Sequence, residues 1–289
     1  MRTIVSINLI LIVGLLAPSN YIGIVPRFMP GIANLPYVHA APRSFETMTH
    51  YRPKPPKPHR FVPLIYSGNP YLPEVALTFD DGPNPVYTPQ ILAILQHFHV
   101  PGTFFGIGRQ MARWPRLVKQ ELAQGNEVGD HTWDHADLVW LSNASIYWEL
   151  QSAYQELGQV GGKMPVYFRP PYGAFNANVL AQAKKLHVMT VLWNIDPTDW
   201  ARPGTSYIVN VIERNMHNGS IVLMHDGGGD RSQTVAALPS VITWLFQHHY
   251  RIVSLQQMID DLAYVPPVTH HKFLLLRSRS VIPAPSRSH

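Results

Sequence analysis

Five short clusters of polar residues in this 289-residue chain have side-chain types that could bind a metal ion or transfer protons. In the first, His131 and His135 lie four residues apart, so both imidazoles can face one metal ion if the segment is helical or tightly turned. Thr132 stands where a helical metalloprotease has its catalytic glutamate, so that motif is absent. Because the chain has fifteen histidines, a chance pair of ordinary histidines is the alternative.

The second cluster is a pair of adjacent carboxylates, Asp80 and Asp81, followed by Gly82 and Pro83. These residue types are common in turns, so the segment by itself favours a simple turn. The functional interpretation is that the two carboxylates divide the work, one binding a metal and the other staying free as a base. The chain has no cysteine, so any catalytic metal must be held by His, Asp or Glu.

The other three clusters contain a guanidinium, further carboxylates and another histidine. Arg169 opens the segment 169–173 and would either make a surface salt bridge or fix a carboxylate and lower its pKa. The segment 196–200, Asp-Pro-Thr-Asp-Trp, is either a capped turn or part of a site. His225 ends an apolar run and therefore needs a polar partner there.

The elements that must position these clusters alternate between short β-rich segments and longer segments of helical period. Seven such units in one stretch predict an α/β fold, a barrel of parallel strands, with an open doubly wound sheet as the alternative. In such folds the loops after the strands form the active face, and each of the five clusters follows a predicted strand. The predicted strands are residues 75–79, 103–107, 127–129, 166–168, 188–193, 221–224 and 251–254.

Capping signals predict where several helices begin and end. Thr88 and Pro89 open one helix, as an N-cap followed by a first-turn proline. Another is expected over about 109–124, ending before Gly125. Two more are expected to follow Ser142 and Asn176.

With 46% hydrophobic and 14% charged residues, the chain as a whole is predicted to be globular. Local changes in composition divide it into four parts. Residues 1–41 are expected to be a signal peptide or an N-terminal membrane anchor, so the protein is expected outside the cytoplasm, secreted or at the cell surface. Residues 42–73 are expected to be a Pro-rich basic spacer, 74–264 the globular domain that carries the five clusters, and 265–289 a basic, disordered tail.

The formal net charge of +5 is unevenly distributed. Residues 74–269 hold 12 Lys or Arg and 17 Asp or Glu, a net charge of −5, so the remaining residues carry +10. We therefore expect the flanks to contact anionic cell-wall polymer or a membrane surface, and we expect no nucleic-acid partner. The protein is expected to be a monomer.

Taken together and in order, the five clusters resemble the five motifs of the polysaccharide deacetylase family, the NodB-homology domain of carbohydrate esterase family 4. The resemblance covers about residues 74–262. It implies a distorted (β/α) barrel with about seven parallel strands that removes acetyl groups from N-acetylated sugars of a polysaccharide. The matching segments are 78–82, 131–135, 169–173, 196–200 and 223–225.

The resemblance also implies a role for individual residues. The ligands of one divalent metal, usually zinc with cobalt, nickel or manganese as alternatives, would be Asp81, His131 and His135. The proton-transfer groups would be a base, Asp80, held by Arg169, and a general acid, His225, oriented by Asp199. The acetyl pocket would be lined by Trp200 and Leu223, with the backbone amide of Tyr172 binding the oxyanion.

The expected activity is therefore zinc-dependent hydrolysis of the N-acetyl group of N-acetylglucosamine in peptidoglycan or chitin-like oligomers, releasing acetate. Another acetylated glycan, such as poly-N-acetylglucosamine or acetylxylan, is an alternative substrate. A catalytically silent wall-binding protein is a second alternative. Two histidines and a carboxylate also suit a non-haem iron oxygenase, but Asp80, Arg169 and His225 would then have no role.

Overall fold

The computed structural model describes residues 64–265, so the predicted leader or anchor, most of the spacer and the basic tail lie outside the described residues. The strands are β1 (Leu64–Ile65), β2 (Glu74–Asp80), β3 (Thr103–Gly106), β4 (Glu127–Asp130), β5 (Tyr167–Phe168), β6 (Met189–Val191), β7 (Ser220–His225) and β8 (Arg251–Ile252). The α-helices are α1 (Thr88–Phe98), α2 (Gly108–Arg113), α3 (Pro115–Ala123), α4 (Asn143–Gly161), α5 (Ala177–Lys185), α6 (Thr205–Asn215), α7 (Ser232–Gln247) and α8 (Leu255–Asp260). Short 3₁₀ turns are η3 (Leu138–Trp140), η4 (Pro171–Gly173), η5 (Asp199–Ala201) and η6 (Asp261–Ala263). None of the helices in this part of the chain is long and apolar enough to cross a membrane.

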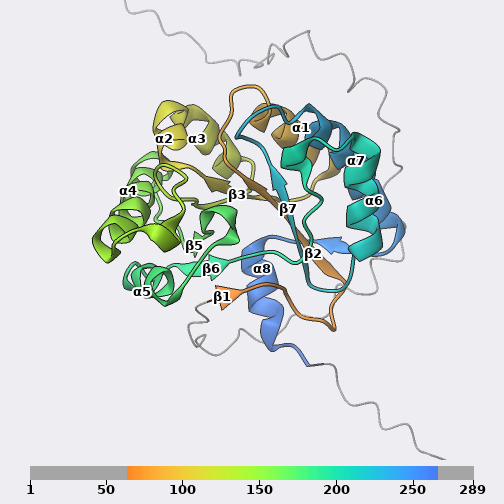
Figure 1. The fold of residues 1–289 in the computed structure, drawn as a ribbon. Helices are drawn as coiled ribbons and strands as arrows, with labels where there is room; N and C mark the ends of the chain where they lie inside the picture. The colour runs from red at the N-terminus through yellow and green to blue at the C-terminus, as the bar shows by residue number, and fades with distance from the viewer. Residues whose placement is uncertain (1–63, 266–289) are drawn as a thin grey trace, which may run out of the picture. The chain divides into compact units, whose positions relative to one another are not determined.

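All pairings between the strands are parallel, in the order β1-β6-β5-β4-β3-β2-β7, with β8 beside β2. Beyond β6, Ile195 forms a parallel bridge with Val222 of β7, so the sheet curls towards closure. Helices pack against one another in the order α5, α4, α3, α1, α7 and α6, an arc around the sheet that Figure 1 shows. The predicted distorted barrel is therefore confirmed over the doubly wound alternative.

Strand β2 shows how the core positions the polar clusters. All seven of its residues are buried, and successive side chains point to opposite faces of the sheet. Leu77 and Phe79 pack outward with α1 and α7, whereas Ala76 packs inside the barrel. Thr78 and Asp80 share the inner face with Ala76, so the alternation aims the Asp80 carboxylate into the barrel.

Register brings the other clusters to the same end of the sheet. Asp80 lies opposite His225 of β7 on one side and Phe105 of β3 on the other. Asp130, the last residue of β4 and the neighbour of His131, pairs with Phe168, which immediately precedes Arg169. Because all these strands are parallel, their carboxyl ends form one face that carries the polar loops.

Most strand ends differ from the sequence prediction by one or two residues, and two differences are larger. β1 falls within the predicted spacer and pairs with β6, so the sheet begins ten residues before the expected start of the domain. The single helix expected over 109–124 is two helices, because Trp114 leaves the helical region and Pro115 begins α3. Proline has no N–H to donate and clashes with the preceding turn, so it starts a helix more readily than it continues one.

Candidate active site

The five predicted clusters meet at the carboxyl ends of the strands. Asp80 ends β2 and Asp81 follows it, Leu223 and His225 lie in β7, and the other site residues follow β4, β5 and β6. The structure brings seven of the predicted residues into two hydrogen-bonded pairs and one three-residue cluster: Asp80 with Arg169, Asp199 with His225, and Asp81 with His131 and His135.

The three-residue cluster has the geometry of a possible metal site. Asp81 Oδ1 lies 3.5 Å from His131 Nε2 and 3.3 Å from His135 Nε2, and one ligand atom from each residue lies within 4.8 Å of the others. Asp81 Oδ1 is buried and accepts no hydrogen bond from the described part of the chain. His131 Nδ1 lies 2.7 Å from the Arg169 carbonyl, which fixes Nδ1 as the protonated nitrogen and leaves the Nε2 lone pair free.

The protonation states of this cluster suit a cation. Burial alone would raise the pKa of Asp81, but the neighbouring histidines, His131 most of all, outweigh burial and lower that pKa well below its ordinary value. Burial, with the charge of His131, lowers the pKa of His135. A carboxylate and neutral imidazoles are the forms that bind a divalent metal, so these three residues fit one.

Asp80 is held by a fully buried guanidinium. Arg169 Nη1 donates to Asp80 Oδ1 at 2.8 Å and to Thr78 Oγ1 at 2.8 Å. The rest of the guanidinium donates to the carbonyls of Val191 and Leu192 and lies 4.1 Å from the centre of the Phe105 ring. Burial lowers the pKa of Arg169 while Asp80 opposes the shift, and arginine stays charged throughout the ordinary pH range. The other oxygen, Asp80 Oδ2, faces the cluster, 3.8 Å from His131 Nε2.

His225 is bound at two points by one carboxylate. Its Nδ1 lies 2.7 Å from Asp199 Oδ1, and its backbone N–H donates to Asp199 Oδ2 at 2.9 Å. Thr234 donates to the same Oδ2 at 2.7 Å. Burial alone would lower the pKa of His225, but the hydrogen bond and charge of Asp199, with the Asp80 and Asp81 charges, raise it above the ordinary value. This arrangement favours an imidazolium whose Nε2 proton can be transferred.

The predicted acetyl-pocket residues lie around this cluster. The Tyr172 ring is exposed and meets the His135 ring edge-on, with centroids 4.7 Å apart. Leu223 is buried on the inner face of β7, two residues before His225, and the exposed Trp200 follows Asp199 in η5. Their roles in binding an acetyl group stay predictions.

Buried carboxyl groups that the sequence did not indicate lie behind the site, Asp226 and Glu121 among them. Asp226 donates its backbone N–H to the Asp80 carbonyl at 3.1 Å, and its side chain accepts from the Thr88 hydroxyl. Burial, with the charges of Asp81 and Asp80, raises the pKa of Asp226 to about 7. Burial also raises the pKa of Glu121 in α3 well above its ordinary value. Asp226 follows His225 directly, but only the packing shows that it supports the turn at Gly82, where a Cβ would meet its carboxylate.

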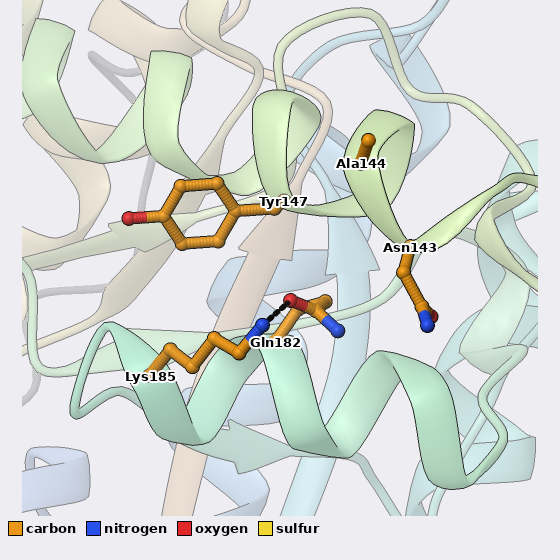
Figure 2. A pocket seen from close by; sticks show the side chains of 5 residues that line it. All are labelled: Asn143, Ala144, Tyr147, Gln182 and Lys185. Carbon is orange, nitrogen blue, oxygen red and sulfur yellow. Dashed lines mark hydrogen bonds between the residues drawn. The ribbon is translucent and has the colours of Figure 1, made fainter.

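A hollow of about 260 Å³ lies away from this chemistry, between α4 and α5. Figure 2 shows its lining, including the 2.7 Å hydrogen bond from Lys185 to Gln182. It contains none of the predicted site residues; the lining side chains are Asn143, Ala144, Tyr147, Gln182 and Lys185.

The curled parallel barrel and the paired carboxylates and histidines at its mouth define a hydrolase-type site with a place for a metal. A family model described as polysaccharide deacetylase matches residues 68–191. The chain is 44% identical over 190 residues to the peptidoglycan-N-acetylglucosamine deacetylase of Bacillus cereus, covering 64% of this chain and 87% of that protein. It is 39% identical over 196 residues to a chitooligosaccharide deacetylase of Bradyrhizobium, covering 64% and 90%. The chain belongs to the polysaccharide deacetylase family, which confirms the resemblance.

Solved structures agree with this assignment. A peptidoglycan N-acetylglucosamine deacetylase in complex with a hydroxamate-type benzamide superposes with a TM-score of 0.66 at 33% identity, over 68% of this chain and 92% of that one. A pseudoenzyme of carbohydrate esterase family 4 from Bacillus anthracis gives 0.65 at 31% identity, over 68% and 69%. Because this fold also occurs in a pseudoenzyme, the fold alone does not confer turnover, and the site residues decide it.

Proposed function

We propose that this chain is a zinc-dependent hydrolase that removes the N-acetyl group from N-acetylglucosamine residues of peptidoglycan or chitin-like oligomers. The observation that carries the proposal is the pairing of Asp80 with Arg169 and of His225 with Asp199 beside the cluster of Asp81 and two histidines. The relatives named as peptidoglycan and chitooligosaccharide deacetylases support the substrate class.

Asp81, His131 and His135 would hold the metal. Two imidazoles and one carboxylate are a ligand set that zinc accepts in hydrolases. When bound, it would supply a Lewis acid that polarises the acetyl carbonyl and makes a nearby water more acidic.

The chain's own residues would move the protons. Asp80 Oδ2 would take a proton from the attacking water, while Arg169 keeps Oδ1 occupied and the carboxylate oriented. His225 would give a proton to the amide nitrogen as the carbon–nitrogen bond breaks. Without that proton the sugar nitrogen would have to leave as an anion, which is a very poor leaving group. The products are acetate and a glucosamine residue.

The buried pairs favour turnover over a silent wall-binding role. A binding protein has no need to keep a fully buried arginine against Asp80 or a buried aspartate against a histidine, because well-packed apolar residues in place of buried ion pairs are often neutral or stabilising. We further propose that the protein works outside the cytoplasm, where its polymeric substrate lies. The basic and then apolar sequence of its first residues, typical of a signal peptide or an anchor, supports this location.

The test is acetate release by the purified full-length chain. Peptidoglycan, chitin oligomers, poly-N-acetylglucosamine and acetylxylan are compared, each after chelation and after zinc is restored. We expect zinc-restored activity on one of the first two substrates. Full activity after complete metal removal would contradict the metal site, and release from acetylxylan alone would move the assignment from N- to O-deacetylation.

A further inference from the structure

The metal loop, residues 131–135, is not helical, although it carries two of the proposed ligands. Thr132 and His135 have φ values of 65° and 61°, in the left-handed region that non-glycine residues seldom adopt. The four-residue spacing of the histidines therefore does not align them in the way a helix would. Contacts from outside the loop must hold this backbone in place.

Helix α2 binds the carbonyl groups of the metal loop. The N–H of Gly108 donates to the Thr132 carbonyl at 2.8 Å, and the N–H of Arg109 donates to the Trp133 carbonyl at 3.2 Å. These are N–H groups of the first turn of α2, which have no partner within their own helix.

Glu149, a buried residue of α4, binds the amide groups of the same loop. Its Oε2 accepts from the N–H of Trp133 and from the N–H of Asp134, both at 3.0 Å. The other side-chain acceptors of loop amides are local: Asp130 accepts from Thr132, and Thr132 accepts from His135. Among the described side chains that accept from loop amides, only Glu149 lies on an element that does not adjoin the loop in sequence.

We propose that Glu149 is a positioning residue for the metal ligands. Its carboxylate fixes two consecutive peptide units between His131 and His135, and so sets how the two imidazoles point towards Asp81 Oδ1. One buried oxygen shared by two consecutive N–H groups leaves the loop little freedom, because buried amide groups need an acceptor. The inference rests on the metal site of the proposed function, but it concerns the geometry of the ligands and not the reaction.

Three substitutions separate the position of the acceptor from its charge. Glu149→Gln keeps an oxygen at the same reach and removes the charge, whereas Glu149→Asp keeps the charge and shortens the side chain by one methylene. Glu149→Ala removes both. Glu156→Ala is the matched control, since Glu156 lies on the same helix seven residues, or about 10 Å, further along.

The measurements are the dissociation constant for Zn²⁺ by competition with a chelator, the absorption spectrum of the Co²⁺-loaded protein, and thermal unfolding of the metal-free protein. We expect Glu149→Gln to bind Zn²⁺ within a few-fold of the native protein. Glu149→Asp and Glu149→Ala should bind about 10- to 100-fold more weakly and show altered Co²⁺ bands, while Glu156→Ala matches the native protein.

Two outcomes would overturn the proposal. One is native Zn²⁺ affinity in a folded Glu149→Ala protein. The other is native Zn²⁺ affinity in Glu149→Asp together with weakened affinity in Glu149→Gln, which would show that the charge acts and the position does not. This comparison of the Asp and Gln variants is decisive even if Glu149→Ala fails to fold. If the native chain itself binds neither Zn²⁺ nor Co²⁺, the proposed metal site fails and this inference fails with it.

Discussion

Asp80 and Asp81 are adjacent in sequence and of identical chemistry, but their surroundings give them different properties. Asp80 points into the barrel, where Arg169 takes one of its oxygens. Asp81 has a positive φ of 73° and turns its carboxylate towards two imidazoles. Side chains alternate between the two faces of β2, which directs Asp80 into the barrel, and the turn after β2 directs Asp81 towards the histidines. This geometry supports the division of work expected from the residue types.

Asp80→Asn tests the proposed base. The amide oxygen can still accept from Arg169, but the side chain can no longer take up a proton, so we expect kcat to fall by about 100-fold or more. Zinc content should stay native, because Asp80 is outside the three-residue cluster, whereas His131→Ala should lose zinc. Acetate release and metal analysis on the same samples check both, and near-native turnover by Asp80→Asn would show that the base lies elsewhere.

Asp199→Asn tests the proposed acid through its pH dependence. His225 must be protonated to act as an acid, and Asp199 helps to raise its pKa, so the native enzyme should keep its activity to higher pH. Removing the Asp199 charge lowers the pKa of His225, and the alkaline limb of the pH profile of kcat should move to lower pH. An unmoved limb, or the same limb in His225→Ala, would exclude His225 as its source.

At the scale of elements, seven strands were predictable because they are short β-rich segments that alternate with helical ones, and a polar cluster follows five of them. β1 was not, since two residues in a proline-rich stretch give no periodic signal, and only their pairing with Thr190 and Val191 makes them a strand. The site was predictable where each motif is local in sequence. Glu149 and Asp226 were not, because their partners depend on how α4 and β7 pack.

The amino end of β2 contains a buried acid far from the chemistry. Glu74 Oε1 lies 3.1 Å from Arg251 Nη2 of β8. Burial, with the nearby Asp261, raises the pKa of Glu74 from 4.5 to about 7, while the charge of Arg251 opposes the shift. The folded state therefore binds this proton more tightly than the unfolded state does. The stability that Glu74 contributes is fully present below about pH 4.5 and is lost as the pH rises through about 7.

Glu74→Gln should remove this component of the pH dependence. Between pH 5 and pH 8 the native free energy of unfolding should fall relative to that of the variant, by up to about 3 kcal/mol, because the amide has no proton to lose. Urea unfolding across this range checks the prediction, with Glu213→Gln on α6 as the control. Parallel curves for the native protein and Glu74→Gln would show that Glu74 titrates normally.

At the scale of the whole chain, the distribution of charge separates catalysis from attachment. Residues 74–269 have a net charge of −5 and the rest of the chain +10, so the acidic part carries the site while the basic flanks lie outside the described residues. An acidic domain gains no electrostatic attraction to an anionic wall polymer. We therefore propose that the flanks supply that attraction.

A chain limited to residues 64–265 tests this separation. Its sheet and site are those described above, including β1, so its kcat/KM on a short neutral chitin oligomer should stay within about twofold of the full chain. Sedimentation with purified anionic cell wall should fall by about tenfold or more at low salt, because about ten positive charges are lost. For the full chain, binding should weaken steeply as salt rises towards 0.5 M, where the screening length is only about 4 Å. Equal, salt-insensitive sedimentation of both chains would instead locate wall binding in the catalytic domain, where glycan contacts would have to supply it.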